Sequence, residues 1–355
     1  MDLRHSYTIT SFPDVTAVPN LESLILSDYP PTLYPDEISS DSASKYLFEL
    51  ERFPEVTREM RMLLLLDMNG CDSIRALPTS IQLLTGLGST HLRCLRILGF
   101  KNNNVVEGNY LTRNMHNAWP SLEELDLSHN FFTRLPASIS QLSRLKYLDL
   151  RSCYNLEELR ELPSLVQILK TNFCKRLQKT DDLSNKYKWL FKISFFYNPL
   201  EDRETQSHLD NLLMKSFVQK CAVVNHRLSI VVRGTKLPNW FTNQRFGNEV
   251  RLKLPHNQIN KMIGLTVCFR FFATSGTQNN FIIKFKRSGE EKLSIRPSGA
   301  DARGLTHVWI GYMSINILRN LCHGSESEYL IITFEYDGNI LECGVCVIYE
   351  DDFDP

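Results

Sequence analysis

The chain has 355 residues, of which 43% are hydrophobic and 23% charged, as is typical of a folded globular protein. Forty lysines and arginines balance forty aspartates and glutamates, and no apolar run is long enough to span a membrane. We therefore expect neither a nucleic-acid nor a membrane partner. The missing secretion signal and nine scattered cysteines favour reduced thiols in the cytoplasm, with the nucleus as a second compartment.

The N-terminal half carries leucines in the spacing L-x-x-L-x-L, which is typical of leucine-rich repeats, each a short strand plus a return segment. Met1, Leu3 and Ser6 match only the second half of this pattern. We therefore expect the chain to start inside a repeat, as the C-terminal portion of a larger receptor or as a truncated relative of one. A divergent end cap is the alternative.

Leu21, Leu24 and Leu26 open the next repeat, and the region 27–62 hides an insertion or a degenerate repeat. The later predicted triplets are Leu63, Leu66 and Met68; Leu92, Leu95 and Ile97; Leu122, Leu125 and Leu127; Leu145, Leu148 and Leu150; and Val166, Leu169 and Thr171. A frame starting at Leu165 is also open for the last of these. Asn130 follows its triplet where the chain leaves the strand, and its amide can bond backbone groups there.

Residues that alternate with these leucines point away from the core, onto what we expect to be the concave face of a curved sheet. Its centre is acidic and its edges are basic. We predict a protein-binding surface there, with a merely solvated polar face as the alternative for any single residue. The candidate residues are Asp67, Asn69, Arg96, Glu124, Asp126, Ser128, Tyr147, Asp149, Arg151 and Lys170.

Two similar segments, Leu77–Ile81 and Leu135–Ile139, each place a proline after the strand, where it starts a turn or a helix. Residues 178–227 then break the leucine pattern. Within them, Thr205–Lys220 has the spacing of an amphipathic helix. We expect this helix to seal the end of the repeat core, and a partner-binding helix is the alternative.

From Leu228 the hydrophobic period changes to two, with turn residues between short segments, which favours an antiparallel β-sandwich. Val250, Leu252 and Leu254 alternate with Arg251 and Lys253, so this strand should have one wet face. The expected strands are Leu228–Arg233, Glu249–Leu254, Ile263–Phe272, Phe281–Arg287, Lys292–Arg296, Thr306–Tyr312, Tyr329–Tyr336 and Cys343–Tyr349.

The string Ile230–Phe241, with Leu237, Pro238, Trp240 and Phe241, resembles the start of the post-repeat domain of certain plant immune receptors. These are the Toll/interleukin-receptor (TIR)-type nucleotide-binding leucine-rich-repeat disease resistance proteins, and the domain is called the C-terminal jelly-roll/Ig-like domain, or C-JID. The segments His307–Tyr312 and Cys343–Glu350 extend the match. The resemblance implies an α/β leucine-rich-repeat horseshoe in residues 1–177, a connecting segment in 178–227 and a C-JID-like sandwich in 228–355.

The residues themselves give no sign of catalysis. The family's NAD cleavage and ATP-driven assembly belong to a TIR domain and a phosphate-binding loop, and this sequence contains neither. Cys343 and Cys346 form the one C-x-x-C pair, but zinc needs two further ligands, so we interpret them as structural thiols. We expect no enzyme activity, no catalytic residues, no cofactor and no metal.

The resemblance implies that the chain recognises a pathogen effector, or a guarded host protein, inside a plant cell. We expect the concave face to do this together with the sandwich loops Asn239–Asn248, Ala273–Asn280 and Pro297–Gly304. One alternative is an autoinhibitory role, in which the repeats contact the nucleotide-binding and TIR domains of a full-length receptor. Another is a carbohydrate-binding sandwich that uses Trp240 or Trp309, although core packing is the favoured role for both.

Overall fold

The computed structural model of the chain describes residues 1–3, 18, 20–26, 62–69, 71, 95–101, 119–181, 183–194, 228–233, 236–253, 261–272, 281–287, 290–295, 306–316, 329–336 and 338–349. They fall into two compact units, one containing the described residues up to Leu190 and the other those from Phe191 onward. The expected helix at Thr205–Lys220 lies outside the described residues. No helix within the described part is long and apolar enough to cross a membrane.

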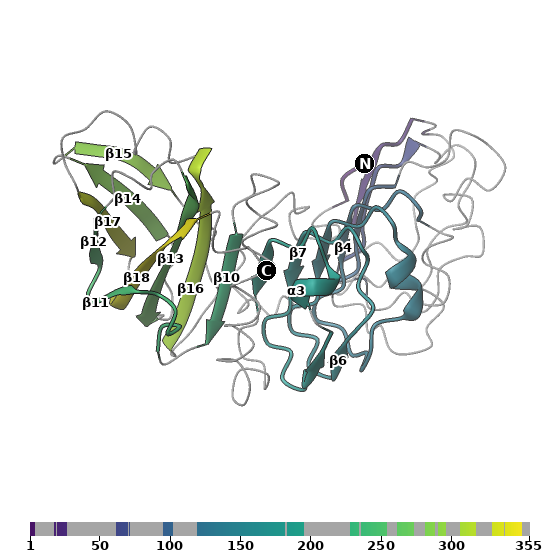
Figure 1. Cartoon of the computed structure of the whole chain (residues 1–355). Coiled ribbons are helices and arrows are strands. Elements are labelled where there is room, and N and C mark those ends of the chain that lie inside the picture. The colour runs from purple at the N-terminus through teal and green to yellow at the C-terminus, as the bar shows by residue number, and fades with distance from the viewer. Residues whose placement is uncertain are drawn as a thin grey trace. The chain divides into compact units, whose positions relative to one another are not determined.

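Six three-residue strands form a parallel stack in the first unit (Figure 1). In order they are β1 (Ser23–Ile25), β2 (Leu65–Asp67), β3 (Ile97–Gly99), β4 (Glu124–Asp126), β5 (Tyr147–Asp149) and β7 (Ile168–Lys170). Each pairs with the next without a register shift. The stack confirms the predicted solenoid-like repeat region.

The middle residue of every strand in this stack is a leucine that points into the core. These leucines are Leu24, Leu66, Leu98, Leu125, Leu148 and Leu169, and none is more than 1% exposed. Full burial of one such side chain contributes about 1.5–3 kcal/mol. Each repeat buries its leucine against its neighbours, so the repeats fold together rather than singly.

The repeat register at β3 corrects the sequence prediction. Ile97 pairs with Leu65 and Glu124, and Leu98 takes the inward position. The inward triplet is therefore Leu95, Leu98 and Phe100, rather than Leu92, Leu95 and Ile97. Two overlapping triplets fit the leucine spacing, but only the observed one continues to an asparagine, Asn103, at the position that Asn130 holds in the next complete repeat.

Asn130 performs the predicted task where the chain leaves β4. It is fully buried, and its Nδ2 donates to the carbonyls of Phe100 and Leu127 at 2.8 and 2.9 Å. Cys153 and Cys174 occupy the same position in the next two repeats. Each thiol donates to the carbonyl of the preceding repeat, at 3.2 and 3.1 Å. The side chain at this position thus joins neighbouring repeats.

The return segments use short elements. The 3-10 helix η3 (Ala137–Gln141) starts after Pro136, as predicted, and buries Ile139. The matching segment at 77–81 lies outside the described residues. Two-residue strands β6 (Glu158–Leu159) and β8 (Lys179–Thr180) pair in parallel. Helix α3 (Leu183–Lys186) follows, and buried Tyr187 donates to Asp181 Oδ2 at 2.7 Å.

The second unit contains two sheets (Figure 1). One has the order β9 (Lys192–Ser194), β10 (Leu228–Arg233), β16 (Thr306–Ser314), β13 (Met262–Phe272), β18 (Asn339–Tyr349) and β11 (Asn243–Phe246). The other has the order β12 (Glu249–Lys253), β17 (Tyr329–Tyr336), β14 (Phe281–Arg287) and β15 (Glu290–Ile295). Among the described residues of this unit, the strands pair antiparallel except β9 with β10.

The antiparallel prediction is confirmed strand by strand. Each of the eight expected strands appears, three of them with the predicted ends: β10, β14 and β17. The burial pattern of β12 alternates, with Val250 and Leu252 inside, which confirms its wet face. Strands β9 and β11 were not predicted from the sequence. These are short, and β11 has four exposed residues with no apolar alternation to reveal it.

An aromatic cluster fills the core between these two sheets. The Phe269 ring of β13 lies 5.0 Å from Phe281 of β14 and 5.3 Å from Phe334 of β17, measured between centroids. Trp309 is buried and stacks on Phe269 at 5.3 Å. Gly311 makes room for that indole, because a Cβ there would lie 2.0 Å from a Trp309 ring carbon. This supports core packing over sugar binding for Trp309.

Candidate protein-interaction face

The sheet of the first unit has a second face, opposite the buried leucines, which we call the ladder face. It comprises three columns of residues that run across the strands. The first column is Ser23, Leu65, Ile97, Glu124, Tyr147 and Ile168; the second is Ile25, Asp67, Gly99, Asp126, Asp149 and Lys170; the third is Asn69, Lys101, Ser128, Arg151 and Asn172. The columns are the predicted binding positions, with the register of β3 corrected.

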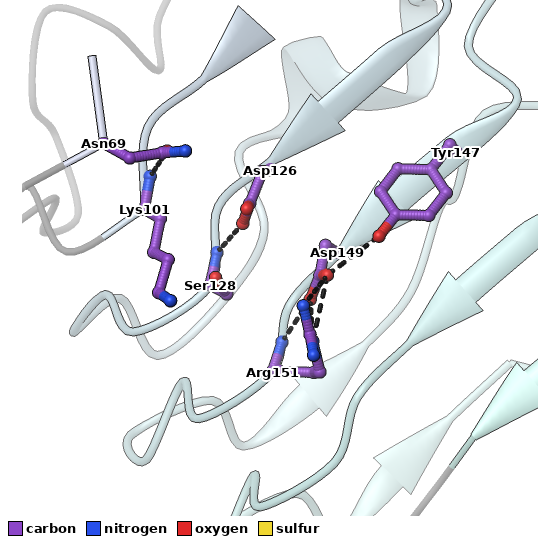
Figure 2. Close-up of polar contacts among 7 residues, drawn as sticks. All are labelled: Asn69, Lys101, Asp126, Ser128, Tyr147, Asp149 and Arg151. Carbon is purple, nitrogen blue, oxygen red and sulfur yellow. Dashed lines mark hydrogen bonds and ion pairs between the residues drawn. The ribbon is translucent and has the colours of Figure 1, made fainter. Parts of the chain in front are cut away.

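The aspartates of the second column bind the backbone of their own repeat. Asp67, Asp126 and Asp149 each accept a hydrogen bond from the N–H two residues later, at 3.1, 2.8 and 3.0 Å. Figure 2 shows the bonds of Asp126 and Asp149. This local turn satisfies a backbone donor at the end of each strand, which a buried turn requires. The residue three positions after the aspartate adopts a left-handed conformation in two of these repeats, at His129 (φ 58°) and Ser152 (φ 58°).

The β3 repeat lacks this aspartate and has Gly99 in its place. Asn69 of the preceding repeat supplies the missing acceptor, because its Oδ1 accepts the Lys101 N–H at 2.6 Å (Figure 2). Gly99 and Asn69 pack closely against each other. A Cβ on Gly99 would lie 2.8 Å from Asn69 Oδ1 and 2.9 Å from Asp67 Oδ1.

Asp149 is the centre of an ionic network on the same face. Arg151 Nη2 lies 2.8 Å from Asp149 Oδ2, and the Tyr147 hydroxyl donates to the same oxygen at 3.0 Å (Figure 2). The Lys170 ammonium lies 5.4 Å from the centre of the Tyr147 ring. Burial raises the pKa of Asp149, but the charges of Arg151 and Lys170 outweigh it and lower that pKa to about 2.

Asp126 lies beside Asp149 in the register but has a different environment. It is 8% exposed, and no described lysine or arginine forms an ion pair with it. Burial, followed by the negative charge of Asp149, raises its pKa. An ion pair thus stabilises the ionised form of Asp149, whereas Asp126 has no such pair.

A row of charges runs along the edge of the sheet, one residue before the first column. Glu123 bridges Arg96 and Lys146 of the neighbouring repeats, at 2.8 Å to each. Their hydrogen bonds, with burial opposing, lower the pKa of Glu123 to about 2. Arg96 was predicted only because of the wrong register at β3, and Glu123 and Lys146 were not predicted because they do not alternate with the leucines.

A shallow recess opens on the ladder face around Gly99. It contains about 310 Å³ of empty space, counting the part that is open to solvent. Its lining residues are Leu65, Asp67, Asn69, Ile97, Leu98, Gly99, Glu124, Leu125, Asp126 and Tyr147. The recess lies where the second column has no side chain, so the glycine creates it.

The ten predicted binding residues separate into two groups by exposure. Asp67, Asn69, Asp126, Ser128, Tyr147, Asp149 and Lys170 are buried, which corrects the expectation that they stand free for a ligand. Arg96 is exposed, and Glu124 and Arg151 are half-buried. The buried residues bond the turns and one another, because neighbouring short strands leave little open space between polar side chains.

Metal-ligand clusters and cysteine thiols are the other chemical features to consider in the described part of the chain. No group of three or more histidine, cysteine, aspartate or glutamate residues within the described part could hold a metal ion. Cys343 is buried, and burial raises its thiol pKa to about 12, so it is not a reactive thiolate. Of the three predicted binding loops, only Asn239–Asn248 is described; it contains β11, with Phe246 85% exposed.

Comparison with known proteins agrees with both halves of the structure. Residues 120–164 match the family model "Leucine Rich repeats (2 copies)", and residues 232–354 match the "C-JID domain". "Disease resistance protein RPS4" of Arabidopsis thaliana is 24% identical over 93% of this chain. The chain is a relative of the plant disease resistance proteins.

Two further disease resistance relatives support this assignment. "TMV resistance protein N" of Nicotiana glutinosa is 32% identical over 42% of the chain, and "Disease resistance-like protein DSC1" of Arabidopsis thaliana is 26% identical over 65%. The chain spans less than a third of the length of each of these three relatives, at 30%, 14% and 23%. The resemblance to TIR-type disease resistance proteins that we predicted from the sequence is confirmed.

Proposed function

We propose that this chain is the ligand-recognition module of an intracellular plant immune receptor. Its ladder face binds a protein, either a pathogen effector or a guarded host protein. The family relationship supports the immune role. The observation that carries the binding site is the distribution of exposure on the face: its buried acids hold the turns, while a rim of half-buried and exposed residues remains for contact.

This rim differs in composition from the acidic centre that we expected. Leu65, Ile97 and Glu124 are half-buried at the first column, and exposed Arg96 and Lys146 lie beside them along the sheet edge. Apolar residues next to both signs of charge suit a protein surface better than a single charged ligand. The rim spans four repeats, which gives a partner an extended area to contact.

The proposal includes the finer architecture and the compartment. We infer that the parallel stack curves into a horseshoe with the ladder face concave, and that the two antiparallel sheets form a jelly-roll/Ig-like sandwich. The module acts without catalysis in the cytoplasm, and also in the nucleus. Its sandwich loops and the nucleotide-binding and TIR domains of a full-length receptor are further contacts in this proposal.

Charge reversal at the rim tests the proposal. Arg96→Glu combined with Lys146→Glu changes two exposed side chains that hold no turn together. Against a panel of purified pathogen effectors and host proteins, we expect any partner of the wild-type chain to bind this variant about tenfold more weakly. Arg144→Glu is the matched control, because Arg144 is an exposed arginine outside the three columns and outside the ion pairs of Glu123.

The outcomes separate recognition from autoinhibition. Unchanged binding of a partner by the rim variant contradicts recognition through this face. Introduced into a full-length receptor, the same variant gives a loss of response if the face recognises a ligand. It gives a constant response without a ligand if the face instead restrains the nucleotide-binding and TIR domains. Reversal at Asp126 or Asp149 cannot make this distinction, because both are buried in the turns.

A further inference from the structure

Strand β11 has one open edge in the second unit. It pairs with β18 on one side and is the last strand of its sheet among the described residues. The Gly247 N–H donates to the Leu341 carbonyl at 3.1 Å and so continues this ladder by one residue. Alternate residues of an antiparallel strand bond to opposite sides. The backbone N–H and C=O groups of Gln244 and Phe246 therefore point away from β18.

The chain changes its partner strand directly after β11 and leaves this edge open. The Phe334 N–H donates to the Asn248 carbonyl at 2.8 Å, so β17 becomes the partner only beyond Gly247. Among the described residues, none bonds the outward backbone groups of Gln244 or Phe246. All four residues of β11 are exposed, and Phe246 is 85% exposed, so no other side chain covers the edge.

The neighbouring edge strand, β12, shows how this fold protects an edge. Charged side chains on an edge strand discourage pairing with another chain. Three of the five residues of β12 are exposed and charged: Glu249, Arg251 and Lys253. Strand β11 has one charged residue and ends in exposed Phe246. This edge is suited to strand addition, in which a partner's backbone bonds the edge and its side chains give specificity.

Arg245 sets the charge that an added strand should carry. The acidic residues nearest in the register already have cations. Glu249 Oε1 lies 3.2 Å from Arg251 Nε, and Glu342 Oε2 lies 3.2 Å from Arg270 Nε. Arg245 is exposed and forms no ion pair with any described residue. Because opposite charges on facing strands attract, an acidic residue opposite Arg245 would stabilise the added strand.

We propose that β11 binds an extended segment of a partner protein as an added antiparallel strand, with an acidic residue opposite Arg245 and an apolar residue opposite Phe246. The inference rests on the proposed function, which includes Asn239–Asn248 among its contacts, and specifies how that segment binds. Gln244 Nε2 donates to the Pro238 carbonyl at 2.9 Å, so the edge is held in place before a partner arrives. A second copy is disfavoured, because pairing Gln244 with the copy's Phe246 sets two Arg245 side chains opposite each other.

The test uses capped pentapeptides as probes and the full chain as receptor. The first peptide, acetyl-Thr-Val-Glu-Val-Thr-amide, places its glutamate opposite Arg245 and its valines opposite Gln244 and Phe246. The second has N-methylated valines, which cannot donate to the edge, and the third has lysine in place of glutamate. Amide spectra of the deuterated, 15N-labelled chain follow each titration. We expect saturable shifts at Gln244 and Phe246 with the first peptide, none with the second, and about fivefold weaker binding of the third.

Two variants locate the effect on β11. Phe246→Pro removes an outward N–H without breaking the ladder to β18, and proline is tolerated at such edge positions. We expect this variant to fold, as the same spectra report, and to bind the first peptide at least about tenfold more weakly. Arg245→Glu should reverse the preference, so that the lysine peptide binds more tightly than the glutamate peptide. Arg176→Glu, at an exposed arginine of the first unit, is the control and should leave both affinities unchanged.

The inference is overturned by no saturable shift, by equal binding of the N-methylated peptide, or by an unchanged charge preference in Arg245→Glu. A dimer in sedimentation that Phe246→Pro abolishes would also overturn it, because the edge would then belong to a second copy.

Failure of the inference and failure of the proposed function give different results. If the peptide does not bind while the Arg96→Glu and Lys146→Glu variant still loses its partner, the ladder face recognises protein without strand addition at β11. If the peptide binds and that variant keeps its partner, the ladder-face proposal fails and the β11 site stands.

Discussion

Single polar side chains hold the repeat turns of this protein together, and Asn130 is the clearest case. Its amide nitrogen lies within hydrogen-bond distance of three backbone carbonyls, those of Phe100, Leu127 and Ser128. Cys153 and Cys174 do the same work with one thiol bond each. The position therefore accepts any small buried donor, and an asparagine makes more bonds there than a cysteine.

Substitutions of Asn130 should show that asparagine stabilises this position more than cysteine does, and cysteine more than alanine. Asn130→Ala leaves buried carbonyls without a donor, and we expect the free energy of unfolding to fall by about 2–4 kcal/mol. Asn130→Cys should cost clearly less, because a thiol fits this position in the next two repeats. Urea unfolding measures both, with Asn155→Ala, which removes one exposed bond of 3.3 Å, as the control. Equal losses in the alanine and cysteine variants would refute the shared role.

The two neighbouring aspartates should respond oppositely to neutralisation. The lowered pKa of Asp149 means that its ionised form stabilises the fold above about pH 4, and that this stability is lost as the pH falls towards 2. The raised pKa of Asp126 means that the fold favours its protonated form. Stability is therefore lost as the pH rises from the pKa of the unfolded state through the higher pKa of the folded state.

At pH 7 we expect Asp149→Asn to destabilise the protein by about 3 kcal/mol, because it leaves Arg151 without its carboxylate. Asp126→Asn should instead leave stability unchanged or raise it, since the asparagine oxygen still accepts the Ser128 N–H. Unfolding curves at pH 7 and pH 3 measure both variants, and the loss in Asp149→Asn should shrink at pH 3. A destabilised Asp126→Asn at pH 7 would contradict this electrostatic account. A position at which removing the charge stabilises the protein is a candidate binding position, because function often costs stability.

At the scale of elements, adjacent repeats compensate for each other's missing groups. Gly99 removes the aspartate that each flanking repeat uses to bond its own turn, and Asn69 replaces it from the preceding repeat. The close contact between the two positions means that neither residue can change alone without cost. Gly99 and Asn69 should therefore behave as a coupled pair across β2 and β3.

A double-mutant cycle tests this coupling. Asn69→Ala leaves the Lys101 N–H without its acceptor, and Gly99→Asn crowds Asn69; we expect each to cost about 1–2 kcal/mol. Together they should cost less than their sum by at least about 1 kcal/mol, because the new asparagine can accept the Lys101 N–H as Asp126 accepts that of Ser128. Additive losses in urea unfolding would show that the two positions are independent.

For the whole molecule, sequence periodicity predicted the buried elements well and the polar face poorly. The leucine spacing located five of the six parallel strands, and period-two alternation located every long antiparallel strand. The exception was β3, where two leucine triplets overlap and only Asn103 distinguishes them. Patterns of apolar residues define which side faces the core, and this is decided locally.

The polar face depends on contacts between repeats, which no single repeat encodes. Glu123, for example, takes its two cations, Arg96 and Lys146, from the repeats on either side. The acceptor role of Asn69 depends on a glycine thirty residues later. The leucine spacing therefore predicted which residues lie on this face, but it did not predict that most of them hold turns, or that Glu123 and Lys146 form ion pairs at the edge.

Site-specific photo-crosslinking tests the central claim, that the ladder face is the protein-binding surface, most directly. A benzophenone amino acid replaces half-buried Ile97 at the rim or, as control, exposed Gln141 of η3 in a return segment. Each chain is illuminated with a partner that binds the wild type. We predict a covalent adduct to the partner from position 97 and none from position 141. An adduct from position 141 alone, with the partner bound throughout, would contradict the account.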